Sequence, residues 1–286
     1  MISIVVCSID QKRFEAFSKN VVATIGELFE LVRIDNVGDE FSLCAAYNKG
    51  AQQANGEIIC FIHEDVFFHT PDWGRKLASH FNDHEVGVIG VAGSRYKSEF
   101  GQNWKDGETS MYRILLKDGI ESGKLLNVNP RNERRSEVVC LDGLFLACKK
   151  SHWKEYPFDE TNYDGFHFYD ADFCMQFFGK KKNYVVYDIL IEHFSQGKYN
   201  KKFLEQAEIF GNKWNKKLPA CLDPRTKSQI AHLEGYMMAK RLQLMQSNGY
   251  SIIHRLKIIG KYFRKHGNFY QVIRSIYFGF FKTEGA

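Results

Sequence analysis

The chain has 286 residues, of which 44% are hydrophobic and 26% charged, with a formal net charge of +5. This globular composition excludes a disordered or collagen-like chain, and the length allows one large domain or two smaller ones. No run of about 18 uninterrupted apolar residues occurs, so we expect no membrane-spanning helix.

The N-terminus and the cysteines indicate a cytoplasmic protein. The first residues form an apolar run without a basic leader, so we expect no signal peptide. The seven cysteines lack CxxC or CxxH spacing, and several lie in apolar runs. We therefore expect reduced thiols that belong to the core, with neither a disulfide framework nor a zinc site.

The first part of the chain alternates two kinds of segment. Apolar runs that predict strands are Ile2–Cys7, Leu28–Ile34, Glu57–Ile62 and Val86–Ala92. Helical patterns lie between them at Arg13–Ile25, Leu43–Ala54 and Pro71–Phe81. The alternation predicts an α/β fold with a mostly parallel, doubly wound sheet. Neither G-x-G-x-x-G nor G-x-x-x-x-G-K-[ST] occurs, which disfavours a dinucleotide-binding Rossmann fold and a P-loop.

The middle of the chain is less regular. Gly93–Arg135 is polar and rich in glycine, which is typical of a long functional loop. Beyond it, the pattern predicts a strand within Glu137–Lys149, a helix over Phe166–Phe178 and a late strand over Tyr184–Ile191.

After residue 200 the sequence becomes helical, with segments at Phe203–Trp214, Ser228–Gln246, Ile252–Lys265 and Tyr270–Phe281. We therefore expect a catalytic domain over residues 1–200 and a helical C-terminal extension over residues 201–286. Residues 235–282 hold nine Lys or Arg and no Asp or Glu, so the remainder carries about −4 (5 minus 9).

The basic extension has an amphipathic helix. Ile252, Leu256, Ile259 and Phe263 share one helical face, with Lys and Arg elsewhere. This pattern suits peripheral contact of residues 249–286 with an anionic membrane. The alternative is that the helix packs on its own domain. No nucleic-acid motif accompanies the charge, so we expect no nucleic-acid partner.

One apolar run leads directly into metal-capable groups, because Ile58–Ile62 is followed by His63, Glu64 and Asp65. Ligands of open α/β sheets bind outside the carboxyl ends of the strands. Carboxylates there need a partner, and a divalent cation that carries a diphosphate is one. The alternative is an acidic turn without a ligand.

In this order, the motifs resemble those of family-2-like glycosyltransferases with the GT-A fold, of the bacterial capsule and surface-polysaccharide type. The resemblance covers residues 1–200. It rests on Ser8-Ile9-Asp10, on Tyr47-Asn48-Lys49-Gly50 with Ala54-Asn55-Gly56-Glu57 and His63-Glu64-Asp65, on Asp142-Gly143, and on Tyr169-Asp170-Ala171-Asp172 with His193. In the same order, these segments are similar to four features of the family. The first is the strand end that binds the nucleotide base, and the second is the run of N-x-G, A-x-G-E/D and D-x-D motifs. The third is the strand at the donor and acceptor sugars, and the fourth is the E-D-x-D helix with a distal metal-binding histidine.

Two positions depart from the family pattern. His63 stands where D-x-D usually has Asp, and Tyr169 stands where the pattern often has Glu. The resemblance implies an Mn²⁺ or Mg²⁺ cofactor with Asp65 as the first-choice ligand, and His63, Glu64 and His193 as further candidates. A histidine ligand favours Mn²⁺. The alternative for His193 is a structural role at a strand end.

The resemblance also implies a catalytic base. Asp170 opens a helix, where free N–H groups and the dipole keep a carboxylate ionised. We expect Asp170 to act as the base and Asp172 to support it, with helix capping as the alternative.

Donor contacts are expected from six residues, with turn formation as the alternative for Asp10 and Asp35. They are Ser8, Asp10, Asp35, Asn48, Asp142 and Gly143.

The function implied is inverting transfer of a sugar from a nucleotide sugar, such as a UDP-sugar. The acceptor would be a saccharide or a lipid-linked glycan in surface polysaccharide synthesis, at the inner face of the cell membrane. A non-catalytic member that binds a nucleotide or a sugar is an alternative. A sugar-phosphate nucleotidyltransferase is disfavoured, because the first turn lacks a Gly-rich sequence with Arg and Lys.

Overall fold

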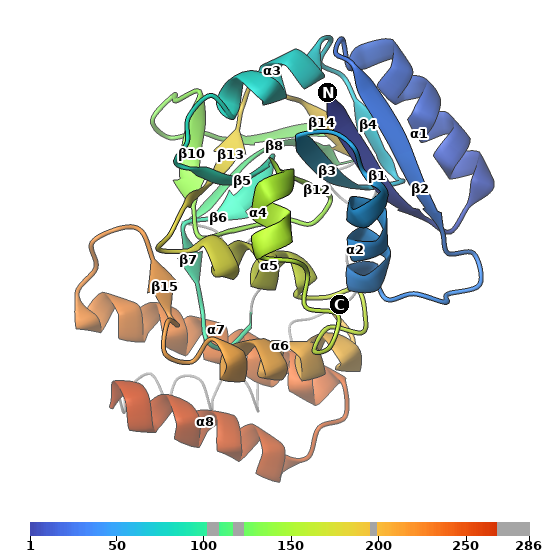
Figure 1. Cartoon of the computed structure of the whole chain (residues 1–286). Helices are drawn as coiled ribbons and strands as arrows, with labels where there is room; N and C mark the ends of the chain where they lie inside the picture. The colour runs from blue at the N-terminus through green and yellow to red at the C-terminus, as the bar shows by residue number, and fades with distance from the viewer. Residues whose placement is uncertain (102–108, 117–122, 195–198, 268–286) are drawn as a thin grey trace. The chain divides into compact units, whose positions relative to one another are not determined.

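The computed structural model describes residues 1–101, 109–116, 123–194 and 199–267 (Figure 1). The chain divides into two compact units. The first comprises Met1–Arg95 and Trp104–Gly197, and the second comprises Tyr96–Asn103 and Lys198–Ala286. The second unit therefore includes a short segment from the middle of the chain, which the expected boundary at residue 200 does not include.

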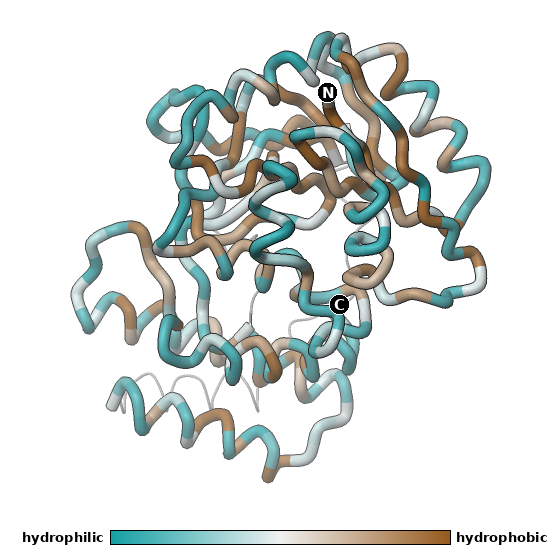
Figure 2. The backbone as a smooth tube through the Cα atoms, viewed as in Figure 1, coloured by the Kyte–Doolittle hydropathy of each residue, from teal (hydrophilic) through white to brown (hydrophobic). Residues whose placement is uncertain are grey.

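The first unit contains a seven-stranded sheet with the strand order β10-β13-β5-β12-β3-β1-β2. Its strands are β1 (Ile2–Ser8), β2 (Phe29–Asp35), β3 (Ile58–His63), β5 (Val86–Gly90), β10 (Arg135–Val138), β12 (Phe145–Lys149) and β13 (Lys182–Val186). Figure 2 shows hydrophobic residues along β1 and β2. β1 is almost wholly buried, as expected of a central strand, whereas β2 lies at the edge of the sheet and is mostly half-buried.

The sheet is mixed rather than mostly parallel. β1 pairs in parallel with β2 and β3, and β13 with β5. β12 runs antiparallel to both of its neighbours, β3 and β5, and β10 runs antiparallel to β13. The reason lies at Asp142–Leu144, where the chain enters β12 from the edge at which β1 and β3 end.

In the described part of the first unit there are five helices: α1 (Gln11–Thr24), α2 (Leu43–Gln53), α3 (Trp73–His80), α4 (Lys150–Glu155) and α5 (Tyr169–Phe177). α1 and α2 begin at side-chain caps, Asp10 and Ser42, which accept hydrogen bonds from main-chain N–H groups of the first turn. α2 approaches β1 closely at Gly50, where an added Cβ would lie 2.2 Å from a Val5 methyl carbon.

A six-stranded sheet completes the first unit. Its strands are β4 (Val66–Phe68), β6 (Ala92–Ser94), β8 (Ser110–Leu116), β9 (Lys124–Val128), β11 (Cys140–Leu141) and β14 (Ile191–His193). β8 and β9 pair within Gly93–Arg135, so the expectation of a loop throughout this segment is wrong. β14 joins the sheet between β4 and β8.

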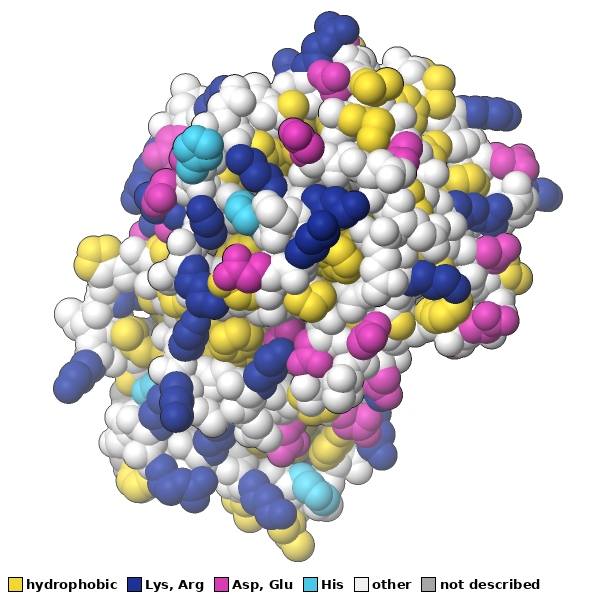
Figure 3. All heavy atoms as spheres, viewed as in Figure 1, with side chains coloured by type: hydrophobic (Ala, Val, Ile, Leu, Met, Phe, Trp, Pro, Cys, Tyr) yellow, Lys and Arg dark blue, Asp and Glu magenta, His cyan; other side chains and the backbone are white. Residues whose placement is uncertain are grey.

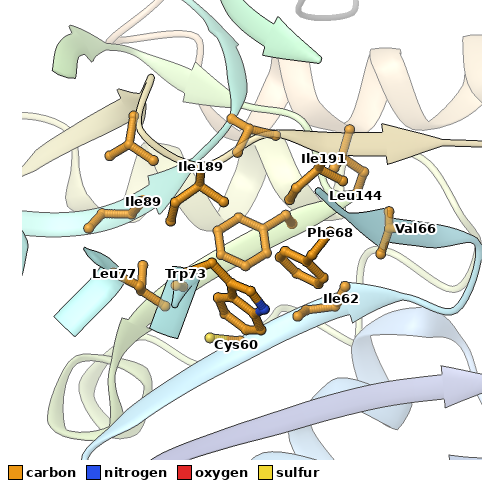
Figure 4. Close-up of a cluster of buried hydrophobic side chains, with 14 of the residues drawn as sticks. Cys60, Ile62, Val66, Phe68, Trp73, Leu77, Ile89, Leu144, Ile189 and Ile191 are labelled. Atoms are coloured by element: carbon orange, nitrogen blue, oxygen red, sulfur yellow. The ribbon is translucent and has the colours of Figure 1, made fainter. Parts of the chain in front are cut away.

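The core of the first unit lies where α1 and α3 cover the strands. Figure 4 shows Trp73 and Leu77 of α3 among its side chains. Trp73 of α3 stacks on Phe68 of β4, with ring centroids 4.1 Å apart and an interplanar angle of 7°. Ile62 and Cys60 of β3 belong to the same cluster. The strand that leads to His63 is therefore held rigidly by apolar packing.

The second unit is helical. It contains α6 (Lys201–Lys213), α7 (Lys227–Ser247), α8 (Ile252–His266) and the strand pair β7 (Tyr96–Lys97) with β15 (Ala220–Cys221). Its core includes Phe100, Met238 and Tyr262. The helix expected over Tyr270–Phe281 lies outside the described residues. In the described part of the chain, no helix is long and apolar enough to cross a membrane.

Candidate functional site

One edge of the seven-stranded sheet gathers the polar groups of the first unit. Because β1 and β3 are parallel, with Cys7 opposite His63, both strands end there. β12 starts at the same edge, and the His63 N–H donates to the Leu144 carbonyl oxygen over 3.1 Å. The carboxyl ends of two strands and the Asp142–Leu144 turn therefore converge, as expected for a binding edge.

His63, Asp65 and His193 form a cluster of metal-capable groups at this edge. β14 pairs antiparallel with β4, which sets His193 opposite Val66. His193 Nε2 lies 3.4 Å from Asp65 Oδ1, and His63 Nδ1 lies 4.0 Å from the same oxygen. One ligand atom from each of the three lies within 4.8 Å of the others. Two imidazole nitrogens and a carboxylate oxygen suit Mn²⁺ better than Mg²⁺.

The imidazole of His63 is in the right protonation state for a ligand. Burial lowers its pKa to about 4, the neighbouring His193 acts in the same direction, and Asp65 opposes them. At neutral pH the ring is therefore uncharged and keeps one nitrogen lone pair. Metal ligands must be deprotonated in this way.

Glu64 has a different role from the predicted one. Its Oε2 accepts hydrogen bonds from the N–H groups of Ile9 and Asp10, at 3.2 and 3.4 Å. Glu64 lies in the turn between β3 and β4, and these bonds hold its carboxylate beside the end of β1. Glu64 is therefore not part of the cluster of three, and it instead ties the end of β3 to the end of β1.

Asp142 and Asp170 form a carboxylate pair beside the cluster. Asp170 Oδ2 accepts a hydrogen bond from the Gly143 N–H over 3.0 Å, which joins the start of α5 to the turn before β12. Desolvation raises the pKa of Asp142 to about 6, and the charge of Asp170 adds to the effect. His193 and Asp65 also act on Asp142, so the pair and the cluster interact electrostatically.

Two cavities meet at the cluster. One, of about 480 Å³, is lined by Cys7, Ile9, Arg13, Asn36, Asp39, Phe41, Ser42, Leu43, Tyr47, His63, Glu64, Asp65, Asp164, Gly165 and Phe166, and we call it the donor cavity. The other, of about 450 Å³, shares Arg13, Glu64 and Asp65 with it and is also lined by Phe67 and Phe194. Both volumes lie in the range of small-molecule sites.

Residues 3–209 of the sequence match a known family model with the description "Glycosyltransferase like family". The chain belongs to this family. The prediction of a family-2-like glycosyltransferase with a GT-A-like α/β fold is therefore confirmed, and its central sheet flanked by helices agrees with it. No curated protein matches the chain in sequence.

The glycosyltransferase-like chain also aligns with solved structures at low identity. They include GalNAc-T7 with UDP, GalNAc and Mn²⁺ (TM-score 0.49, 13% identity, 93% of this chain and 55% of that chain). They also include TarS 1–349 of S. aureus with UDP-GlcNAc (0.45, 12%, 94% and 73%) and A197 from STIV (0.41, 14%, 68% and 86%). The chain spans about half the length of the first of these.

At the ends of β1 and β2, the residues that line the donor cavity are the neighbours in sequence of the predicted contacts. Ser8, a predicted donor contact, is completely buried and is not among the residues that line the donor cavity. Asp10 caps α1, where the Arg13 N–H lowers its pKa, and Asp35 accepts from the Val37 N–H. Cys7, Ile9 and Asn36, their neighbours along the chain, line the cavity instead.

Asn48 has a structural role that differs from the predicted donor contact. Its Nδ2 donates to the Phe158 carbonyl oxygen over 2.9 Å. Its Oδ1 accepts from Trp153 Nε1 and from the Phe158 N–H, at 3.0 and 3.1 Å. A fourth bond, from Nδ2 to Glu160 Oε2 over 3.4 Å, completes the set, and Asn48 thus holds the segment after α4 against α2.

Two residues near the site were missed by sequence reasoning. Arg13 lines both cavities from the first turn of α1, and its only signal is that it follows the first strand closely. Tyr169 was noted only as a departure from the family pattern, yet its hydroxyl lies 2.8 Å from His63 Nε2. Asp172, the predicted support of Asp170, is buried near Tyr163, whose pKa is raised by burial and by this carboxylate.

Proposed function

We propose that this glycosyltransferase-like chain transfers a sugar from a nucleotide sugar, with a UDP-sugar as the donor class, and that a divalent cation assists it. The observation that supports this most directly is the cluster of His63, Asp65 and His193, which lies beside the donor cavity. A bound cation supplies positive charge to the leaving diphosphate. His63, Asp65 and His193 would hold it.

The charges of the donor cavity support the need for a cation. Its lining carries four carboxylates, Asp39, Glu64, Asp65 and Asp164, and one guanidinium, Arg13. A diphosphate in this acidic surrounding is repelled unless further positive charge accompanies it. A divalent ion at the cluster and Arg13 together meet this requirement.

The proposed chemistry is a single displacement with inversion. Asp170 takes the proton of an acceptor hydroxyl, whose oxygen then bonds to the anomeric carbon as the bond to the diphosphate breaks. The Gly143 and Ala171 N–H groups both donate to the Asp170 carboxylate, at 3.0 and 2.7 Å. These bonds stabilise the ionised form, which a general base needs.

The acceptor we propose is a saccharide or a lipid-linked glycan of surface polysaccharide synthesis, at an anionic membrane surface. α8 supports the membrane contact, although Ile259 of the predicted face is buried in the core of the second unit. The exposed apolar residues of α8 are Ile252, Ile253, Leu256 and Phe263. Lys257 and Arg264 are also exposed, and Figure 3 shows apolar and basic side chains together over α8. This combination fits an anionic bilayer. Residues 268–286 of the predicted contact lie outside the described part.

Thermal stability in the presence of nucleotides tests the donor site. Wild type, Asp65→Asn and the control Asp39→Asn are melted with uridine, UDP, UDP-sugars and other nucleoside diphosphates, each with Mn²⁺ or with a chelator. A ligand at about 100 times its Kd adds about 2.7 kcal/mol. We expect Mn²⁺-dependent stabilisation by one nucleotide family, which Asp65→Asn loses and Asp39→Asn keeps.

Two outcomes would contradict the proposal. Stabilisation that is the same with Mn²⁺ and with chelator would remove the role of the cation. No stabilisation of wild type by any nucleotide would exclude the donor site. Tight binding of a nucleotide sugar without transfer or donor hydrolysis would instead favour a non-catalytic member of the family.

A further inference from the structure

The two positions at which the chain departs from the family pattern contact each other. Nε2 of His63 lies 2.8 Å from the hydroxyl oxygen of Tyr169. Tyr169 is the first residue of α5 and is only 3% exposed, so the contact is shielded from water. A hydrogen bond of this length in a buried position fixes the orientation of the imidazole ring.

The two ring nitrogens of His63 face different partners. Nε2 faces Tyr169, whereas Nδ1 faces Asp65 Oδ1, which in turn lies 3.4 Å from His193 Nε2. Only Nδ1 is therefore directed to the place where the three candidate ligands meet. A neutral imidazole that binds a cation through Nδ1 carries its hydrogen on Nε2, and this hydrogen needs an acceptor.

Tyr169 provides that acceptor. A tyrosine hydroxyl is neutral at pH 7 and has lone pairs to offer, so the Tyr169 oxygen can accept this hydrogen at the observed separation of 2.8 Å. Its place depends on Gly143, since a Cβ there would lie 1.9 Å from the Tyr169 hydroxyl oxygen. Gly143, predicted as a donor contact, thus makes room for the hydroxyl that reaches His63.

We propose that Tyr169 is a positioning residue, which holds His63 with Nδ1 directed at a divalent cation shared with Asp65 and His193. This inference rests on the proposed cation-assisted function. It explains why both departures occur in one chain, because a histidine in place of the usual aspartate needs a partner for its second nitrogen. Partners of this kind tune metal sites, and their loss weakens metal binding about 10- to 100-fold.

Direct Mn²⁺ binding without any donor tests the assignment. The affinity is measured by titration calorimetry, and unbound Mn²⁺ is counted from its electron paramagnetic resonance signal. We expect Tyr169→Phe to bind Mn²⁺ about 10- to 100-fold more weakly than wild type. Tyr187→Phe is the matched control, because it also removes a buried hydroxyl, which bonds to Val128 and Ser136 in the same unit. It should keep the wild-type affinity.

A double-mutant cycle separates positioning from packing. With His63→Asp, no imidazole remains to be oriented, so adding Tyr169→Phe should change the Mn²⁺ affinity by less than about twofold. His63→Gln replaces His63→Asp if the latter does not fold. An equal loss in both backgrounds would show that Tyr169 acts through packing and overturn the assignment.

The outcomes distinguish this inference from the function on which it rests. If wild type and folded Tyr169→Phe bind Mn²⁺ equally, only the assignment of Tyr169 fails. If wild type binds no Mn²⁺, the cation-assisted function fails and the inference fails with it.

Discussion

Glu64 Oε2 accepts a hydrogen bond from the main-chain N–H of Ile9 over 3.2 Å, and it is this bond that joins the ends of β3 and β1. The other carboxylate oxygen, Oε1, is buried and has no hydrogen-bond partner among the described residues. Ile9 and Glu64 both line the donor cavity. Glu64 therefore shapes the cavity by holding the chain after β1.

Glu64→Ala should lower the free energy of unfolding by about 1–3 kcal/mol, because two N–H groups lose their acceptor. Nucleotide affinity should fall as well, while Mn²⁺ affinity changes by less than about twofold. Denaturant unfolding and Mn²⁺ titration check these expectations. Glu64→Gln, which keeps an oxygen acceptor, is the milder control. A loss of Mn²⁺ affinity as large as that of Asp65→Asn would return Glu64 to the ligand set.

Arg13→Ala should weaken UDP binding about tenfold, which corresponds to about 1.4 kcal/mol, and leave uridine binding unchanged. The reason is that, among the described residues, Arg13 is the one Lys or Arg that lines the donor cavity, and uridine has no phosphate. Calorimetric titration with both ligands measures the difference. Lys12→Ala serves as the control, since Lys12 is exposed and does not line the cavity. Equal weakening of UDP and uridine would contradict a phosphate contact.

Asp170→Asn should reduce sugar transfer about 10²- to 10⁴-fold while donor affinity stays within about twofold. The amide oxygen of asparagine still accepts from the Gly143 N–H, so the position is kept and only the proton acceptor is lost. Initial rates and donor titration separate the two quantities. Asp172→Asn, a buried carboxylate two residues further along α5, should affect stability more than rate. Transfer by Asp170→Asn at the wild-type rate would exclude this residue as the base.

Glu234 in α7 predicts a pH dependence of the second unit. Its Oε1 accepts from the Tyr96 hydroxyl over 2.5 Å, and the Glu99 N–H donates to its Oε2 over 3.2 Å. Burial raises the pKa of Glu234 to about 7, although Tyr96 and Ser98 oppose the shift. Burial also disfavours the charge of Glu99, but His266 and Lys265 hold the pKa of that carboxyl below its usual range.

Because folding raises the pKa of the Glu234 carboxyl, the folded state binds its proton more tightly than the unfolded state does. The stabilising contribution of this group is therefore present at low pH and is lost as the pH rises from about 4.5 to about 7. Glu234→Gln should thus gain stability relative to wild type across this window, by about 1.4 kcal/mol for each unit of pKa displacement. Unfolding at a series of pH values measures this, and a pH-independent difference would contradict it.

Leu256→Glu combined with Phe263→Glu should reduce the binding of the full chain to phosphatidylserine vesicles by at least about tenfold, since each apolar side chain contributes about 1.5–3 kcal/mol when buried. Co-sedimentation with vesicles measures the bound fraction. Val22→Glu with Val37→Glu is the matched control, because these residues are also exposed and apolar but lie in the first unit. Equal binding of all three proteins, or equal binding to neutral vesicles, would exclude α8 as the contact.

Much of the site could be predicted because strand ends are visible in sequence. The apolar run of β3 stops at His63, just before Asp65. His193 was expected with them from the family resemblance, although the late strand predicted over Tyr184–Ile191 is divided between β13 and β14, which belong to different sheets. What sequence does not reveal is the direction of each side chain at a strand end. A shift of one residue reverses the face, so the strand end alone predicts Ser8, although Cys7 and Ile9 line the cavity.

The strands within Gly93–Arg135 were missed for a different reason. β8 pairs with β6 and with β14, which lies about 75 residues further along the chain, so its partners are not local. Polar and glycine-rich flanks concealed the apolar run of Ser110–Leu116. The bond between Tyr169 and His63 was hidden in the same way, because 106 positions separate the two residues.

The membership of Tyr96–Asn103 in the second unit limits how this protein can be divided by genetic engineering. β7 pairs with β15, and Glu99 bonds to Lys265 and His266, so the C-terminal helices are completed by residues encoded between two strands of the first unit. Deleting everything after residue 197 would leave a strand without its neighbour and a buried acid without its cations. A functional chimera between relatives must therefore exchange two separate stretches of the gene at once.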